Sequence, residues 1–522
     1  MQTFPLTLDR ILDHAAKWHG EAEVVTAREG RENARIDYAG LRERAKKTSS
    51  VLAGFGVVAG ERVATLAWNT QAHMEAWFGV MGMGAVCHTL NPRLTAEQLA
   101  WMLGQSGARI VIVSGDLMKL ALDMADRTEG LERILVIDGE VPASHARDVV
   151  EALDSLVEAA TGDIAWGDFD ETAPSGLCFT SGSTGAPKGV TYTHRSSFLH
   201  TFKLLQADVL GARTDDVILP IVPLFHANAW GLPFAAPAAG SKLVLPGRLT
   251  DGASLARLIA AEGVTIAVGV PTVFLGLCEY LDASGTTLPS LQRIILGGAA
   301  TPPALMDRIE KQLGVTVQNS WGMTELSPVG VFGVLSDPDR HAALSGRPAL
   351  GVDLMLADES GAPLAEQRDN EGRLHVRGAA VIDRYFGQEQ AATDADGWFD
   401  TGDLARIDRK GNLVITGRAK DLIKSGGEWI NPAEIEALVC ALPEVSLAAV
   451  IGRADVKWSE RPILLVEVRE GHDISDQAML DALRGQVASW WIPDAVVRLP
   501  EMPLASTGKV DKMRLRATYG GG

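Results

Sequence analysis

A loop rich in glycine and hydroxyl residues is the segment best suited to chemistry. Residues 180–189 read TSGSTGAPKG and follow the apolar run GLCF. Glycines permit tight turns and close approach of backbone NH groups to a ligand, so this loop could hold a polyphosphate. It is not a Walker A loop, because Lys188 is followed by Gly189. The expected phosphate contacts are Thr180, Ser181, Gly182, Ser183, Thr184, Gly185 and Lys188.

Further blocks that contain aromatic, acidic or basic residues follow this loop along the chain. In isolation each is weak evidence, since a lone tryptophan is usually core and a TGD tripeptide is usually a turn. A flexible linker would also explain a Gly/Ser loop, but linkers seldom leave through Pro-Lys-Gly into a strand such as VTYTH. The blocks are PLFHANAWG (223–231), GGAATP (297–302), NSWGMTE (319–325), FDTGDLARID (399–408) with GRAKDLIKSGGEWINP (417–432), and STGKVDK (506–512).

Taken in this order, the blocks resemble those of the adenylate-forming superfamily, which comprises acyl-CoA synthetases, adenylation domains and luciferases. The resemblance covers nearly the whole chain. It implies an acid–thiol ligase that forms an acyl-adenylate from ATP and a carboxylic acid, then an acyl-CoA thioester, with release of AMP and pyrophosphate. The SGGEWI segment and the pocket block are most similar to medium-chain fatty acid–CoA ligases and methylmercaptopropionate–CoA ligases.

The resemblance also assigns a nucleotide and metal site. Trp321 would stack on adenine, Thr324 would contact the α-phosphate, and Asp403 with Arg418 would bind the ribose or its phosphate. Glu325 and Thr184 would be the Mg²⁺ ligands, and both are expected to be catalytic. The other residues implied at this site are Gly298, Ala299, Asn319, Gly322 and Met323.

Lys509 is implied as the catalytic lysine. A flexible ammonium that contacts both the attacking carboxylate and the α-phosphate would offset their repulsion. The sequence departs from the family pattern at Leu504 and Ala505, but STGKVDK is intact.

The resemblance places a hinge at Lys420, about which the C-terminal domain would rotate after adenylation. The loop carrying Lys424, Gly426, Gly427 and Trp429 would then line a passage for coenzyme A. An ordinary interdomain linker is compatible with the same residues.

The substrate pocket is expected around His226, a catalytic candidate that the resemblance places between the acyl site and the coenzyme A channel. An isolated histidine would more often be structural. The wall looks apolar and lacks a placed cation, which favours a hydrophobic monocarboxylic acid of short or medium chain length, or an arylalkanoic acid. The expected pocket residues are His226, Trp230, Val270, Gly297, Gly298 and Gly322.

Apolar runs that alternate with amphipathic stretches predict an α/β fold with parallel sheets covered by helices. Near residue 350 the strands become short and separated by Gly, Asp and Asn, which indicates an antiparallel or barrel-like subdomain at about 345–417. With the resemblance, this predicts an AMP-binding domain of two sheet subdomains plus a small β-barrel (1–419) and a mobile α+β domain (420–522). The runs read as strands are 62–68, 109–115, 133–139, 241–246, 265–271 and 293–299.

The formal net charge of −18 argues against nucleic acid or an anionic membrane as a partner. The four cysteines show no metal or redox spacing, and neither a signal peptide nor a membrane span is recognisable. We therefore expect a soluble cytoplasmic enzyme that uses ATP, Mg²⁺ and coenzyme A. A homodimer is expected on base rates.

Three alternatives share parts of this pattern. A standalone adenylation enzyme that loads a carrier protein would use the same first-step residues, although no carrier domain follows Lys509. An ATP sensor without chemistry would have no use for Lys509 and Glu325. A luciferase-like oxygenase shares the first half-reaction and is excluded only weakly.

Overall fold

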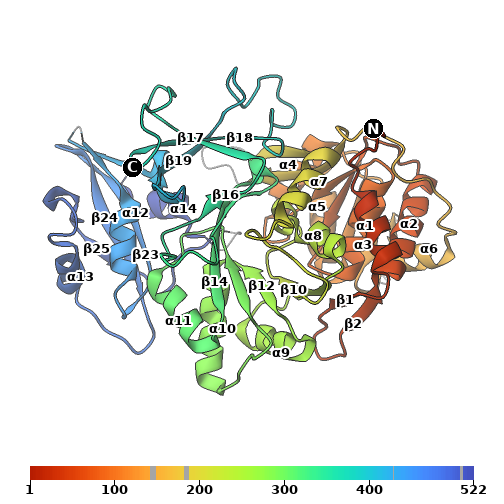
Figure 1. The fold of residues 1–522 in the computed structure, drawn as a ribbon, viewed down its shortest axis with the longest axis horizontal. Coiled ribbons are helices and arrows are strands. Elements are labelled where there is room, and N and C mark those ends of the chain that lie inside the picture. Colours follow the sequence, from red (N-terminus) through yellow and green to blue (C-terminus); the bar gives the residue numbers. More distant parts are fainter. Residues whose placement is uncertain (142–148, 181–186, 427, 506–508, 522) are drawn as a thin grey trace.

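The computed structural model describes residues 1–141, 149–180, 187–426, 428–505 and 509–521. Two large sheets and a small antiparallel sheet form the N-terminal part, and a further sheet forms the C-terminal unit. Figure 1 shows this C-terminal unit (blue) beside the green segments, on the side away from the N-terminal helices (red). None of the helices in these described ranges has the length and apolar character needed to cross a membrane.

The first large sheet has seven strands in the order β7-β6-β5-β3-β4-β8-β9. All its neighbouring strands are parallel except the β8–β9 pair, which the phosphate-loop segment connects. Its strands are β3 (Arg62–Leu66), β4 (Val86–Thr89), β5 (Ile110–Ser114), β6 (Arg133–Ile137), β7 (Val150–Ala152), β8 (Pro174–Thr180) and β9 (Lys188–Thr193).

The second large sheet has nine strands in the order β16-β15-β14-β13-β12-β10-β11-β1-β2. The run from β14 to β1 is parallel, and antiparallel strands close both edges. Its strands are β1 (Glu23–Thr26), β2 (Ala34–Asp37), β10 (Val217–Pro220), β11 (Lys242–Leu245), β12 (Ile266–Gly269), β13 (Arg293–Leu296), β14 (Thr316–Gly322), β15 (Val329–Phe332) and β16 (Arg347–Pro348).

Helices fill the space between the two large sheets and cover their outer faces. The shared core joins residues of both sheets to α1 (Asp9–Trp18), α2 (Tyr38–Gly54), α3 (Gln71–Gly82), α6 (Leu153–Ala159), the last turn of α7 (His194–Leu204) and α8 (Leu232–Ala239). The outer face of the seven-stranded sheet packs on α4 (Ala96–Ser106) and α5 (Met118–Ala125). The outer face of the nine-stranded sheet packs on α9 (Gly252–Glu262), α10 (Pro271–Ser284) and α11 (Pro303–Leu313).

The predicted change near residue 350 is an antiparallel sheet of four strands in sequence order. Its core includes Tyr192 and Trp321 from the two large sheets, so the three sheets meet there. The strands are β17 (Val352–Ala357), β18 (Glu371–Gly378), β19 (Phe399–Ile407) and β20 (Leu413–Arg418).

The C-terminal unit is an α+β sandwich. One face of its sheet packs on α12 and α13, and the other packs on residues around α14. Lys420 lies in the 3-10 turn η4 (Ala419–Asp421) that joins this unit to β20. The elements are β21 (Ile423–Ser425), β22 (Glu428–Ile430), α12 (Pro432–Cys440), β23 (Val445–Asp455), β24 (Ser459–Val468), α13 (Asp476–Leu483), β25 (Val496–Arg498) and α14 (Lys512–Tyr519).

The α/β class predicted from the sequence is confirmed, as are the six buried strands and their parallel pairing. Local chemistry explains why the intervening helices start and stop where they do. Thr95 and Gln98 form a reciprocal capping box at the start of α4, and Gly107 ends that helix in the left-handed conformation. At α9, the Asp251 side chain caps the start by accepting the Ser254 amide, and Gly263 ends the helix in the left-handed conformation. The domain boundary at Lys420 stays a prediction.

Asn69 ties the two large sheets together next to the pocket described below. It follows β3, and its side-chain amide donates to the carbonyls of Pro220 and Val222 at 3.0 and 2.9 Å. Its side-chain oxygen accepts the amide of Leu224 at 2.7 Å. One buried side chain of the first sheet therefore fixes the loop that leaves β10 of the second.

We expect Asn69→Ala to lower the free energy of unfolding of the large domain by about 2–4 kcal/mol, because it leaves buried backbone groups without partners. The urea midpoint of the N-terminal domain measures this. Asn69→Asp keeps an acceptor for Leu224 but sets a carboxylate oxygen against the carbonyls of Pro220 and Val222, so it should lose at least as much. The exposed Asn370→Ala should lose almost nothing. Equal midpoints for Asn69→Ala and Asn370→Ala would contradict this role.

Candidate active site

Asp403 is the most buried carboxylate of the site and lies on β19. Its Oδ2 accepts the indole NH of Trp321 at 2.9 Å, and its Oδ1 pairs with Nε of Arg418 at 2.6 Å. Burial raises the pKa of Asp403, while Arg418, the Trp321 hydrogen bond and Lys509 act in the opposite direction. A carboxylate offers about four acceptor positions, so capacity for ribose hydroxyls remains.

Glu325 lies in the 3-10 turn η3 (Thr324–Leu326), which follows β14. Tyr385 donates its hydroxyl to Oε1 of Glu325 at 2.9 Å, and the Lys188 ammonium sits 4.7 Å from the centre of the Tyr385 ring. Burial raises the pKa of Glu325, and Arg418 and Lys188 oppose that rise. Two cations predicted to contact phosphate or ribose thus lie near the predicted metal ligand.

The phosphate loop can be followed only at its ends. Thr180 ends β8 and Lys188 begins β9; the two residues pair, and the Thr180 hydroxyl donates to the Lys188 carbonyl at 3.3 Å. Ser181, Gly182, Ser183, Thr184 and Gly185 lie outside the described residues.

A pocket of about 90 Å³ lies between the large domain and the segment that carries Lys509. It brings together four of the six predicted pocket residues, namely His226, Trp230, Val270 and Gly298. The described residues that line it are Asn91, Arg93, Ile221, Val222, Pro223, Phe225, His226, Trp230, Thr250, Val270, Thr272, Val273, Gly298 and Lys509.

A strained turn presents His226 and Trp230 to this pocket. Residues Ala227, Asn228, Ala229 and Trp230 all have φ between 45° and 56° within η2 (Ala227–Gly231), in the left-handed region. Such residues cost roughly 1 kcal/mol or more each, so the surrounding packing must hold them. Burial lowers the pKa of His226 to about 4, with smaller contributions from Lys509 and Arg93, so its imidazole is neutral at neutral pH.

The two glycines after β13, Gly297 and Gly298, leave room for neighbouring side chains. A Cβ on Gly297 would lie 2.5 Å from Oγ of Ser320 and 2.9 Å from the Trp230 ring. Gly298 lines the pocket with φ +79°, and a Cβ there would lie 3.9 Å from Cε of Lys509. Gly322 is not among the lining residues described, and a Cβ there would lie 2.3 Å from the Pro328 carbonyl oxygen.

Lys509 reaches the pocket from the C-terminal unit. The residue as a whole is exposed, whereas its side chain lines the pocket. Burial of the ammonium is the largest cause of a pKa lowered to about 8, followed by the positive charge of Arg418; Asp403 acts in the opposite direction. The ammonium is therefore charged at neutral pH and electrostatically coupled to both partners in the Asp403–Arg418 ion pair.

The expectation of a wall without a placed cation is wrong, because Arg93 lines the pocket. Burial lowers the pKa of this guanidinium. Arg93 lies four residues after the end of β4, close to the carboxyl end of a parallel strand, where ligand sites concentrate. That position is the signal in the sequence that could have revealed it.

The remaining residues predicted at the nucleotide site differ in their surroundings. Asn319 has its side chain bonded to Thr301, Ala342 and Leu344, so its amide secures the end of β14. Met323 packs on the core shared with the four-stranded sheet, and Ala299 is exposed.

Trp321 is largely buried, with its indole edge on Asp403. Thr324 is also buried, and its carbonyl accepts the Tyr192 hydroxyl at 3.0 Å.

The hairpin predicted to line the coenzyme A passage belongs to the C-terminal sheet. Lys424 pairs with Trp429 across β21 and β22, and its ammonium lies 5.5 Å from the Trp429 ring centre. Gly426 has φ +62° and faces Trp458, while Gly427 lies outside the described residues. Among the described residues that line the pocket, Lys509 represents the C-terminal unit and no hairpin residue is present.

A magnesium ion would find one protein carboxylate here. In the described part of the chain there is no group of three or more His, Cys, Asp or Glu side chains that could enclose a metal. Mg²⁺ in nucleotide sites is commonly held by one or two carboxylates together with substrate phosphates. Glu325, buried and hydrogen-bonded through one oxygen, fits that limited role.

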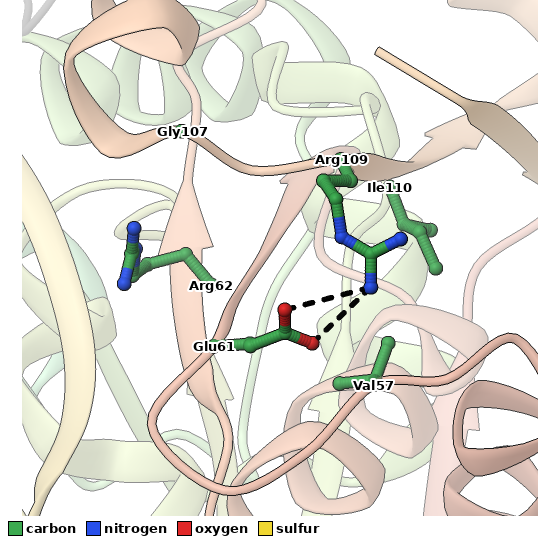
Figure 2. Close-up of a pocket in the computed structure, with 6 residues that line it drawn as sticks. All are labelled: Val57, Glu61, Arg62, Gly107, Arg109 and Ile110. Carbon is green, nitrogen blue, oxygen red and sulfur yellow. Dashed lines mark hydrogen bonds and ion pairs between the residues drawn. The ribbon is translucent and has the colours of Figure 1, made fainter. Parts of the chain in front are cut away.

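A second cavity of about 90 Å³ lies at the amino ends of β3 and β5, two neighbouring central strands of the seven-stranded sheet. Figure 2 shows Arg109 directed at both oxygens of Glu61 there. Arg109 also pairs with Glu132 at 2.5 Å. Its charge is therefore already balanced, and this cavity lacks the cluster of cations and buried carboxylates seen near Lys509.

Two stacked α/β sheets, an antiparallel sheet and a small C-terminal unit that inserts a lysine between them define a nucleotide-dependent ligase fold. The chain matches the family model for AMP-binding enzymes over residues 12–386 and the model for their C-terminal domain over residues 434–509. The chain belongs to the AMP-binding enzyme family, and it is an AMP-forming acid–CoA ligase. The resemblance found in the sequence is thereby confirmed.

Among curated relatives, the chain is 41% identical to 3-methylmercaptopropionyl-CoA ligase of Ruegeria pomeroyi, with 99% of this chain and 97% of that one covered. It is 39% identical to a medium-chain-fatty-acid–CoA ligase of Ectopseudomonas oleovorans, with coverage of 99% and 96%. ATP-bound MatB from Rhodopseudomonas palustris is 26% identical, with a TM-score of 0.88 and 99% of each chain covered. An anthranilate CoA ligase, AuaEII, at 23% identity and a TM-score of 0.89, supports the fold.

Proposed function

We propose that this enzyme joins a hydrophobic monocarboxylic acid, a short- or medium-chain fatty acid or a related acid, to coenzyme A through an acyl-adenylate. The observation that carries the proposal is the position of Lys509, whose side chain enters the pocket that His226 and Trp230 line. The names of the curated relatives support an acid of this class.

In the first half-reaction, a carboxylate oxygen of the acid attacks the α-phosphorus of ATP, and the bond from that phosphorus to pyrophosphate breaks. Both reactants are anions, so the barrier includes their repulsion. Lys509 would contact both and orient the in-line attack, while Arg418 and Asp403 would hold the ribose. No protein nucleophile is needed, because the substrate itself supplies the attacking atom.

The polyphosphate would lie against residues 180–185 and Lys188. Glu325, with Thr184, would hold Mg²⁺, which supplies charge neutralisation for the phosphates. Trp321 would contribute an edge to the adenine side of the site, and its hydrogen bond to Asp403 would keep that carboxylate oriented. Thr324 would contact the α-phosphate.

In the second half-reaction, the thiol sulfur of coenzyme A attacks the acyl carbon, AMP leaves, and the thiol proton goes to solvent or to a neighbouring base. Lys420 would serve as the hinge that withdraws Lys509 and brings up the loop of Lys424, Gly426, Gly427 and Trp429. His226 would separate the acyl site from the thiol passage. Its neutral state at neutral pH suits a gate that must move without carrying a charge.

Apolar side chains outnumber polar ones in the pocket, which supports an apolar acyl wall. Ile221, Phe225 and Val273 are among the apolar ones. Arg93 is the exception, a guanidinium among the described lining residues. A carrier protein in place of coenzyme A is the runner-up thiol acceptor. A homodimer stays a prediction.

A panel of acids with ATP, Mg²⁺ and coenzyme A, read as AMP release, tests the substrate class. Hexanoate, octanoate, 3-methylthiopropionate and phenylpropanoate should be used at least about tenfold better in kcat/KM than adipate, because a second carboxylate would have to be desolvated against an apolar wall. Arg93→Met serves as the control. Preference for adipate in the wild type, lost in Arg93→Met, would instead identify Arg93 as the reader of a dicarboxylic acid.

Lys509→Ala should slow adenylate formation by roughly 10²–10⁴-fold, as loss of a transition-state cation does. The second half-reaction of this variant, from preformed acyl-AMP, should be nearly unchanged. The control Lys119→Ala, which alters an exposed lysine, should leave both half-reactions nearly unchanged. Because the ammonium has a pKa of about 8, the first step of the wild type should fall as pH rises above about 8, where the charge is lost. Equal losses in both half-reactions would remove Lys509 from this role.

Lys420→Pro should separate the two half-reactions, because proline fixes φ near −65° and removes rotational freedom at the proposed hinge. We expect pyrophosphate exchange to be retained and thioester formation to be slowed, with Lys420→Ala as the control. If proline instead holds the thioester-forming arrangement, pyrophosphate exchange should be slowed and thioester formation retained, which also indicates a hinge. Wild-type rates for both steps would place the pivot elsewhere.

A further inference from the structure

Helix α7 carries a buried lysine that the proposed chemistry does not use. Lys203 is 4% exposed, and no carboxylate pairs with it among the described residues. Its ammonium donates to the backbone carbonyl of Val329. Burial lowers the pKa of Lys203 to about 7. An unpaired buried cation is costly, so its retention calls for an explanation beyond packing.

His200 lies one turn earlier on the same face of α7 and completes the contact. It is 1% exposed, and its Nε2 accepts the amide of the same Val329 at 3.1 Å. An accepting Nε2 places the ring proton on Nδ1 in the neutral imidazole, and burial lowers the pKa of His200 well below its ordinary value. Both backbone polar groups of one residue are thus bonded by two side chains of one helix.

Val329 ends the short segment that presents Glu325. The segment leaves η3 through Ser327, which has φ +67°, and returns to the sheet at β15. Its start is held by the Tyr192 hydroxyl on the Thr324 carbonyl, and the Ser327 hydroxyl donates to Ala380 at 2.9 Å. With Val329 fixed, the orientation of Glu325 is determined from both sides.

The other nitrogen of His200 faces the strained turn behind the pocket. A Cβ on Gly231 would lie 2.7 Å from Nδ1 of His200, and Gly231 has φ +79°. Gly231 directly follows Trp230, whose ring lines the pocket. One histidine therefore contacts the backbone on the metal side and the backbone on the acyl side.

We propose that His200 and Lys203 are positioning residues which, by clamping Val329, orient Glu325 for Mg–ATP, and that His200 also supports the turn carrying Trp230. The inference rests on the proposed function, because it takes Glu325 as the metal ligand. Neither residue touches a substrate. Both would act through the backbone.

The experiment measures the Mg²⁺ dependence of ATP binding by calorimetry, without turnover, and beside it pyrophosphate exchange as a function of Mg²⁺ concentration. Lys203→Met, which keeps the shape but removes the donor, should raise the half-saturating Mg²⁺ concentration roughly 5–30-fold, less than the full cost of one buried hydrogen bond to a charged group, because the effect reaches Glu325 only through the backbone. His200→Leu should do the same and in addition raise the KM of the acid. Lys203→Gln and His200→Gln, which keep a donor or an acceptor, should recover part of the loss.

Lys119→Met is the matched control, because it makes the same substitution at an exposed helical lysine, and it should leave the Mg²⁺ dependence unchanged. A purely structural role would lower the fraction of active enzyme and kcat without moving half-saturation. That result for both Lys203→Met and His200→Leu would overturn the proposal. If Lys203→Met does not fold, His200→Leu and the two glutamine variants decide the question by the same readout.

Glu325→Gln separates this inference from the function on which it rests. An amide is a poorer ligand for Mg²⁺, so this variant should show a raised half-saturation of its own. If Glu325→Gln shifts and the α7 variants do not, the clamp is wrong and the metal assignment stands. If Glu325→Gln does not shift, the metal assignment itself fails.

Discussion

The buried carboxylate of Asp403 is the interaction on which the arrangement of the site depends. It joins Trp321, near the end of β14, to Arg418, the last residue of β20. It also interacts electrostatically with the ammonium of Lys509 from the C-terminal unit. A carboxylate this far from water is tolerated because Arg418 balances its charge and Trp321 donates a second hydrogen bond, and removal of Arg418 would leave an uncompensated buried charge. Three parts of the chain therefore meet around a single side chain.

The overall charge makes this local arrangement necessary. A chain with a net charge of −18 cannot attract ATP and a carboxylate through its general field, so the cations must be placed where the anions meet. Lys188, Arg418 and Lys509 come from three different segments and converge near Glu325 and Asp403. Burial, followed by the positive charges of Arg418 and Lys420, lowers the pKa of Lys509, and the carboxylate of Asp403 acts in the opposite direction. The site therefore holds its lysine close to the limit at which it stays charged at neutral pH.

Short-range chemistry made much of the fold predictable. Apolar runs gave the six buried strands, and the shift to Gly, Asp and Asn near residue 350 marked the antiparallel sheet. Asp403 and Arg418, which pair across β19 and β20, were both predicted at the ribose. One sequence does not reveal which distant loops share a pocket. Arg93 and Lys509 both line the pocket although they lie 416 positions apart in the chain. Nor does one sequence reveal which polar residues of a recognised block serve the structure. The side chain of Asn319 forms its hydrogen bonds with Thr301, Ala342 and Leu344.

The left-handed turn before α8 could not be anticipated either, because no glycine stands at Ala227 through Trp230 to announce it. Its strain has to be offset by contacts from outside the turn, and α7 supplies one of them through His200 against Gly231. The same helix reaches Val329 behind Glu325. A displacement of α7 would thus alter the acyl wall and the proposed metal ligand together, whereas a displacement of the C-terminal unit would move Lys509 and the hairpin of Lys424 and Trp429 and leave both of those in place. In the proposed mechanism the large domain would keep the acid and the nucleotide in fixed register, and the freedom needed between the two half-reactions would come from the proposed hinge at Lys420, which follows β20.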